Sequence, residues 1–234
     1  MGVTSTLHAM ISSLKIALNA GLFLTIVLSL SARAVETREP IILVLGDSIA
    51  EGYGIQAKDA FPQVLEDLLK QEGYPKVRIK SAGISGSTSA SAITRLTWHL
   101  KSKEKPDVVI LELGANDGLR ALPVAQTRLN LKKALELILA SNATPVLTGM
   151  KLPLNYGDKY RADFEKVFNE LAKTPGVVWM PFLLKDVGGD PTLNIEDGMH
   201  PNEKGQKLIA KNLIPYVKQA LKESKTASKK EKVK

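Results

Sequence analysis

The 234-residue sequence predicts an α/β fold: a single domain with a doubly wound, parallel, five-stranded sheet flanked by helices. Short apolar segments of strand length alternate with longer segments whose apolar residues recur at helical spacing. Residues 41–45 and 107–113, the two strongest apolar segments, stop abruptly at polar turns that contain glycine. Continuous apolar strands that alternate with helices are typical of a parallel sheet covered on both faces.

Five strands are expected, at residues 41–45, 77–81, 107–113, 144–150 and 177–180. The helical segments between them cover residues 59–72, 89–102, a stretch that Pro123 opens, and 160–173. A last helix follows Pro201 and Asn202, with apolar residues at helical spacing that we expect to face the core, namely Ile209, Leu213, Val217 and Leu221.

Residues 1–34 are typical of a secretory signal peptide rather than of a folded domain. A 15-residue apolar segment, 16–30, is interrupted only by three small polar residues and is followed by Ala32-Arg33-Ala34. The segment is short for a membrane span, although an uncleaved anchor remains the alternative. We therefore expect export and cleavage near Ala34, which would leave one domain at residues 35–221.

The charge of +8 is unevenly distributed and does not indicate a nucleic-acid partner. Residues 222–234 contain six Lys and two Glu, and the expected signal segment contributes two further cations, so the domain is only weakly basic. The basic tail is expected to be a disordered, solvated end. Loose attraction to an anionic membrane surface or cell-wall polymer is the alternative function for this tail.

Cysteine and histidine restrict the available chemistry. The absence of cysteine excludes disulfides and a thiol nucleophile. Of the three histidines, His8 lies in the expected signal segment, so an exported enzyme has only His99 and His200 as candidate bases. His99 lies in a predicted helix next to Trp98 with no aspartate placed near it in sequence, which favours a packed or surface histidine. No His, Asp or Glu cluster has the spacing of a metal site, so we expect neither metal nor cofactor.

Ser48 stands where the first predicted strand ends, after Gly46 and Asp47. Open parallel sheets place their sites at the carboxyl ends of their strands. A serine there can expose its hydroxyl and aim its own N–H at the same volume, as acyl transfer requires of a nucleophile and an oxyanion donor. The alternative is a turn in which these residues serve only turn and capping roles.

Asp197 and His200 lie three residues apart in the loop before the last helix, so one turn can hold both side chains together. An aspartate that accepts the Nδ1 proton fixes the imidazole tautomer and leaves Nε2 to accept the serine proton. A capped turn with a surface histidine is the alternative for this short motif.

Four ordered blocks carry a resemblance to a known family: Gly-Asp-Ser-Ile at 46–49, Gly86, Gly-Ala-Asn-Asp at 114–117 and Asp-Gly-Met-His-Pro-Asn at 197–202. In order and spacing they resemble the blocks of the SGNH hydrolases, also called GDSL esterases, over about residues 41–217. Segments 111–120 and 152–157 are most similar to those of the exported thioesterase, lysophospholipase and arylesterase group. The sheet expected for this family is flavodoxin-like.

The resemblance implies roles for individual residues. Ser48 would be the nucleophile, His200 the base and then the acid, and Asp197 the carboxylate that orients the imidazole. The oxyanion hole would consist of the N–H groups of Ser48 and Gly86 and the side-chain amide of Asn116. In the 152–157 segment, Asn155 and Tyr156 would form a loop over the acyl site, although this Asn-Tyr-Gly stretch can equally be turn chemistry alone.

The activity that the resemblance implies is hydrolysis of lipid-like esters or thioesters, including lysophospholipids and aryl esters, by a cofactor-free serine esterase. A carbohydrate O-acetyl esterase with the same triad is the enzymatic alternative. A non-catalytic envelope-binding protein with a degenerate site is the alternative outside enzymes. The sequence differs from the residues usual in this group at Ser81-Ala82-Gly83 and at Ser87. These differences affect the expected substrate contacts more than the chemistry. The sequence does not predict an oligomeric state.

Overall fold

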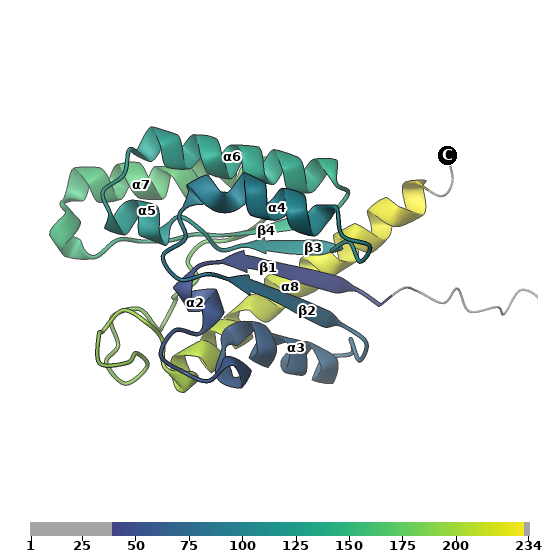
Figure 1. The fold of residues 1–234 in the computed structure, drawn as a ribbon, viewed down its shortest axis with the longest axis horizontal. Helices are drawn as coiled ribbons and strands as arrows, with labels where there is room; N and C mark the ends of the chain where they lie inside the picture. The colour runs from purple at the N-terminus through teal and green to yellow at the C-terminus, as the bar shows by residue number, and fades with distance from the viewer. Residues whose placement is uncertain (1–38, 232–234) are drawn as a thin grey trace, which may run out of the picture. The chain divides into compact units, whose positions relative to one another are not determined.

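The computed structural model describes residues 39–231 as one compact unit built on a central parallel sheet (Figure 1). The strands are β1 (Ile41–Gly46), β2 (Arg78–Gly83), β3 (Val108–Leu111), β4 (Thr144–Thr148) and β5 (Val178–Met180). They are arranged in the order β2-β1-β3-β4-β5, and every neighbouring pair is parallel. The five strands expected from the sequence are all present, and this order is the flavodoxin-like one.

Helices cover both faces of the sheet, which makes the fold doubly wound (Figure 1). One face carries α3 (Phe61–Gln71) and α8 (Glu203–Glu231), which pack against each other. The other face carries α4 (Ala92–Leu100), α6 (Val124–Ala140) and α7 (Asp158–Leu171), packed in that order. Two short helices follow strands β1 and β3, namely α2 (Ser48–Glu51) and α5 (Ala115–Leu119), and three 3₁₀ turns complete the connections, η1 (Ala57–Asp59), η2 (Ser89–Ser91) and η3 (Leu154–Tyr156).

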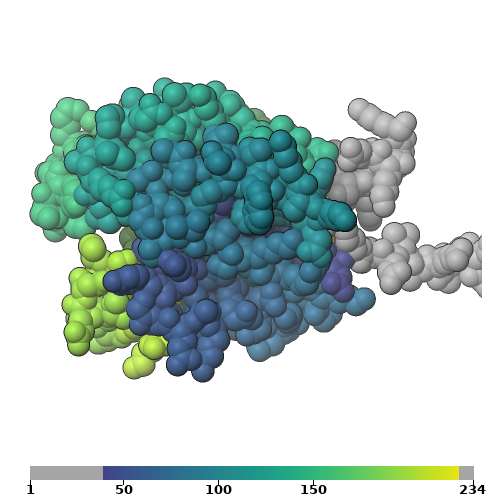
Figure 2. Space-filling model, viewed as in Figure 1, coloured from purple at the N-terminus to yellow at the C-terminus, as the bar shows by residue number. Residues whose placement is uncertain are grey.

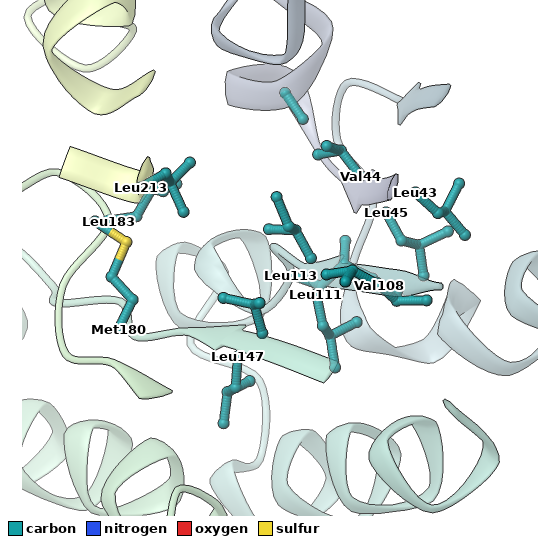
Figure 3. Close-up of a cluster of buried hydrophobic side chains, with 14 of the residues drawn as sticks. Leu43, Val44, Leu45, Val108, Leu111, Leu113, Leu147, Met180, Leu183 and Leu213 are labelled. Carbon is teal, nitrogen blue, oxygen red and sulfur yellow. The ribbon is translucent and has the colours of Figure 1, made fainter. Parts of the chain in front are cut away.

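The core forms where the apolar strands meet the apolar stripes of the helices. The three central strands β1, β3 and β4 are buried along their whole length, which explains their continuous apolar sequences. Figure 3 shows side chains of these strands and of β5 packed together with Leu213 of α8. The residues of α8 expected to face the core are fully buried: Ile209, Leu213, Val217 and Leu221.

The strand order places a topological switch beside β1. The chain leaves β1 toward β2 on one side and later returns to β3 on the other, so the turns after β1 and β3 diverge at the same edge. Parallel sheets bind ligands at the crevice outside this point. Ser48 follows β1 and Asn116 follows β3, and both therefore lie at the switch.

The C-terminal residues differ from the expectation. Residues 222–231 continue α8 and do not form a disordered tail, so that part of the prediction is wrong. Ser224 is buried and the ammonium group of Lys225 lies 5.5 Å from the centre of the Tyr74 ring, so the helix still packs on the domain beyond residue 221. Lysine, glutamate and alanine are also good helix formers, which the composition argument overlooked.

The expected signal peptide at residues 1–34 lies outside the described residues. Among the helices of residues 39–231, none combines the length and the apolar character needed to cross a bilayer.

Gly83 lets β2 lie close to α2. A larger side chain at this position is therefore expected to lower the stability of the fold. A Cβ there would overlap the backbone nitrogen of Glu51 and lie 2.6 Å from the carbonyl carbon of Ala50. Because backbone cannot rotate away as a side chain can, we expect Gly83→Ala to lower the free energy of unfolding by about 1–3 kcal/mol in urea titrations. Gly188→Ala is the matched control, since its nearest contact would be 3.4 Å. Equal stability of the two variants would contradict this packing argument.

Candidate active site

The first site residue is positioned by a short, well-capped helix. Asp47 follows β1 and caps α2, its carboxylate accepting a hydrogen bond from the Ile49 N–H at 3.0 Å. Ser48 is therefore the first residue of α2, and Gly52 ends the helix with a φ of 80°. The first N–H groups of a helix have no partner within it, so the Ser48 N–H is available to a ligand. Asp47 thus supports the turn by capping α2.

Asp197, His200 and Ser48 form one chain of hydrogen bonds. The Nε2 atom of His200 lies 2.9 Å from the Ser48 Oγ, and its Nδ1 atom lies 2.6 Å from the Asp197 Oδ2. The second carboxylate oxygen, Oδ1, accepts the backbone N–H groups of Met199 and His200 at 2.8 and 2.9 Å. The structure thus brings together the three residues that the sequence proposed for the triad.

The loop that carries the acid and the base closes on itself. The Ile195 N–H donates to the carbonyl of His200 at 2.8 Å, and Asn194 pairs with Pro201 as an antiparallel bridge. Figure 2 shows this yellow-green segment after β5 beside the dark-blue segment after β1 on the surface of the molecule. A tight loop of this kind holds Asp197 and His200 in one orientation toward α2.

The carboxyl group of Asp197 is kept in its ionised form. Burial by itself raises the pKa of Asp197, but the hydrogen bonds that it accepts from His200 and Met199 outweigh burial, and the net pKa lies below its ordinary value. An ionised Asp197 accepts the Nδ1 proton, so Nε2 is the atom left to accept a proton from Ser48.

Asn116 and Gly86 stand at the same edge of the sheet. The Nδ2 atom of Asn116 donates to the Asp47 Oδ2 at 3.2 Å, which leaves the second amide hydrogen free for a ligand. The turn of Gly86 is tied to the nucleophile turn, because the Ile84 N–H donates to the carbonyl of Gly46 at 3.2 Å. Gly86 itself has a φ of 75°, and its carbonyl accepts from the Arg120 guanidinium at 3.0 Å.

Tyr53 is a site residue that the sequence argument missed. Its ring lies against the imidazole of His200, with centroids 4.6 Å apart and planes inclined by 41°. The side chain remains 51% exposed. Tyr53 lies five residues beyond Ser48, and only the fold shows that α2 turns it back toward the loop of His200.

The remaining candidate residues from the sequence are Asn155, Tyr156 and His99. Tyr156 lies in η3 and its hydroxyl donates to the carbonyl of Leu119 at 2.8 Å, which ties η3 to α5, the helix of Asn116. In the described part of the chain, no hydrogen bond joins Asn155 or Tyr156 to the triad. His99 contacts Trp98 on α4 and takes no part in the triad. Within residues 39–231, no group of three or more acidic or histidine side chains could hold a metal ion.

Comparisons with known proteins agree with this geometry. The GDSL-like lipase/acylhydrolase family matches residues 44–208. Thioesterase 1/protease 1/lysophospholipase L1 of Escherichia coli K12 is 38% identical over 196 residues, which cover 82% of this chain and 90% of that protein. An arylesterase of Vibrio mimicus is 36% identical, covering 80% of this chain and 92% of that protein. An acetylxylan esterase of Xylanibacter ruminicola is a more distant relative, 27% identical, of whose length 43% is covered.

A crystal structure of TesA superposes with a TM-score of 0.73 at 37% sequence identity, covering 77% of this chain and 99% of that one. The residues matched by the family, 44–208, include Ser48, Asp197 and His200. The chain belongs to the GDSL-like lipase/acylhydrolase family and is a carboxylic ester hydrolase.

Proposed function

We propose that the protein hydrolyses lipid-like esters and thioesters through an acyl-enzyme on Ser48. One observation carries this proposal: the continuous hydrogen-bonded chain from Asp197 through His200 to the Ser48 hydroxyl. A serine becomes a nucleophile when an oriented base stands within hydrogen-bonding distance of its hydroxyl. The distances of 2.6 and 2.9 Å meet this requirement.

The proposed reaction uses His200 twice. In acylation, His200 Nε2 takes the Ser48 proton while Oγ attacks the carbonyl carbon, and the imidazolium then gives that proton to the departing alcohol or thiol. In deacylation, Nε2 takes a proton from water, hydroxide oxygen attacks the acyl carbon, and the proton returns to Ser48. Asp197 remains ionised and stabilises the imidazolium in both halves.

The negative oxygen of each tetrahedral intermediate would be bound by three neutral donors: the N–H groups of Ser48 and Gly86 and the amide of Asn116. Neutral donors aimed at the place where charge develops stabilise the transition state without any proton transfer. The positive φ of Gly86 supports this role, because it turns the backbone in a direction that other residues rarely adopt.

The surroundings of the triad favour an apolar substrate. Three large apolar side chains next to site residues are about half exposed: Tyr53 at 51%, Ile84 at 53% and Met199 at 51%. Leu154 of η3 is 78% exposed. Exposed apolar side chains that gather near a site are typical of surfaces that bind apolar ligands. We therefore infer medium-chain or long-chain acyl groups, with lysophospholipids and aryl esters ranked first, as the names of the relatives also suggest.

The test combines a rate series with a covalent label. Hydrolysis of p-nitrophenyl esters from acetyl to palmitoyl, with a lysophospholipid alongside, is expected to rise toward medium or long chains. A fluorophosphonate should stop hydrolysis by adding one equivalent to Ser48, identified by peptide mass spectrometry. We also propose that the protein is exported and cleaved near Ala34, which the intact mass of the labelled protein would report.

The other outcomes of this experiment point to the other functions. Hydrolysis restricted to acetyl esters would indicate a carbohydrate O-acetyl esterase. No hydrolysis and no label, with salt-sensitive retention on anionic polymers, would indicate an envelope-binding protein. A label on a residue other than Ser48 would remove Ser48 from the mechanism.

A further inference from the structure

We propose that Glu112 is a positioning residue of this site: its carboxyl group holds Asp47, and Asp47 holds the amide of Asn116. The inference rests on the proposed role of Asn116 as an oxyanion donor. It concerns a buried acid that no step of the proposed reaction uses.

Glu112 is completely buried beneath the nucleophile turn. It follows β3, its exposed fraction is 0%, and its Oε2 accepts the backbone N–H of Asp47 at 2.9 Å. The space for this carboxyl group exists because residue 46 is glycine, since a Cβ at Gly46 would overlap the Glu112 Oε2. The glycine before Asp47 thus makes room for an acid contributed by the neighbouring strand.

The Gly46–Asp47 peptide is held from both sides. Glu112 accepts its N–H, and the Arg95 guanidinium on α4 donates to its carbonyl oxygen at 3.0 Å. The same Arg95 nitrogen donates to the carbonyl of Ala82 at the end of β2. Two side chains from different parts of the fold, Glu112 after β3 and Arg95 on α4, therefore fix the peptide bond between Gly46 and Asp47.

Asp47 transmits this arrangement to Asn116. Its Oδ1 accepts the Ile49 N–H and its Oδ2 accepts the Asn116 amide at 3.2 Å. The direction of the remaining Asn116 hydrogen depends on where the Asp47 carboxylate lies. If Asp47 moved, the amide would lose its orientation although Asn116 itself would be intact.

Glu112 is the member of this pair that its surroundings favour in the neutral form. Burial first, and then the negative charge of Asp47, raise the pKa of Glu112 well above its ordinary value. Burial also raises the pKa of Asp47, but Asp47 has hydrogen bonds from Ile49 and Asn116 to stabilise its charge. The titratable groups facing the pair are Arg95 and His200, and within residues 39–231 neither forms an ion pair with Glu112.

The second oxygen of Glu112 supports the same assignment. Oε1 is buried and has no hydrogen-bond partner among the described residues. An unpaired, buried oxygen is costly and far more so when it carries charge. We therefore assign the proton that the pair shares mainly to Glu112.

This assignment predicts a loss of turnover at alkaline pH. When Glu112 ionises, two negative carboxylates face each other without solvent, Asp47 is displaced and the Asn116 amide is released. Loss of one oxyanion donor lowers kcat about 10²- to 10³-fold. KM should change little, because the donor acts on charge that develops only in the transition state.

Glu112→Gln tests the inference, since the amide preserves the neutral shape and cannot ionise. We expect near-normal kcat at neutral pH and no alkaline fall, whereas the natural protein loses turnover as pH rises. Asp117→Asn is the matched control: Asp117 is also buried beside Asn116 but accepts from Ser89 and Thr127, so its variant should keep the alkaline fall.

A second measurement does not depend on catalysis. The infrared band of a protonated carboxyl group should be present at neutral pH and absent in Glu112→Gln. An unchanged infrared spectrum, or an alkaline fall that survives in Glu112→Gln, would overturn the inference even if the turnover of the natural protein proceeds through Ser48. Conversely, a missing fluorophosphonate label on Ser48 would overturn the proposed function while leaving the infrared result intact.

Discussion

Ser48→Ala is expected to lower kcat for ester hydrolysis on the order of 10⁶-fold, the loss typical of removing a triad nucleophile. The substitution deletes the hydroxyl that His200 Nε2 contacts at 2.9 Å and leaves the fold unchanged, because Oγ forms no other hydrogen bond among the described residues. Steady-state rates on the best ester of the chain-length series measure the loss of kcat, and circular dichroism tests whether the fold is unchanged.

Two further variants make this result specific. Ser102→Ala removes a serine hydroxyl at the opposite edge of the sheet, where it donates to the carbonyl of Glu104, and should leave the rate unchanged. A Ser48→Ala/His200→Ala double variant should be no slower than Ser48→Ala, because residues that act as a unit are not additive. Hydrolysis by Ser48→Ala within tenfold of the natural rate would contradict the acyl-enzyme mechanism.

Asp197→Asn is expected to lower kcat about 10⁴-fold through the wrong histidine tautomer. The Oδ1 atom accepts two backbone N–H groups, so the amide oxygen of the variant must remain there. The amide nitrogen then takes the place of Oδ2 beside His200 Nδ1 and donates to it. The imidazole proton consequently lies on Nε2, which can no longer accept the proton of Ser48.

Asp190→Asn is the matched control for this variant. Asp190 lies in the same loop and its carboxylate accepts from the backbone and the hydroxyl of Thr192, but no histidine of residues 39–231 forms a hydrogen bond with it. Rates and urea stability should both be close to those of the natural protein. Equal losses of turnover in Asp190→Asn and Asp197→Asn would contradict the tautomer explanation, since the loss would then come from the loop as a whole.

The sequence predicted the sheet well because its signals are local. The apolar segments that became β1 and β3 end at Gly46 and near Leu113, and the turns after them carry Ser48 and Asn116. Asp197 and His200 could be paired because three residues separate them and one turn can hold both. The contact of this pair with Ser48 spans 152 positions and followed only from the order of blocks in a family resemblance.

Other features depend on tertiary structure and gave no local signal. Glu112 stands in an apolar segment that predicts a strand, and its contact with Asp47 exists only because β1 and β3 are neighbours. Tyr53 approaches His200 only through the fold of α2 and the loop after β5. The residues after Lys222 are helical although their high charge predicts a solvated, disordered end, because lysine, glutamate and alanine also favour a helix.

The length of α8 sets the distance between the active site and the lysine-rich C-terminal end of the helix. The helix begins at Glu203, three residues after His200, and runs back past the sheet (Figure 1). Its 29 residues, at about 1.5 Å each, place its lysine-rich end about 40 Å from the start of the helix. The start of β1 lies on this same side of the molecule (Figure 1).

A molecule held to an anionic surface by its lysine-rich end would therefore direct Ser48 away from that surface. Forty ångströms exceeds several Debye lengths at physiological salt, so the charge of the surface would not reach the reacting ester. Such a molecule would take its substrates from the surrounding water. This arrangement favours amphiphiles with one acyl chain, which leave a bilayer far more readily than lipids anchored by two chains.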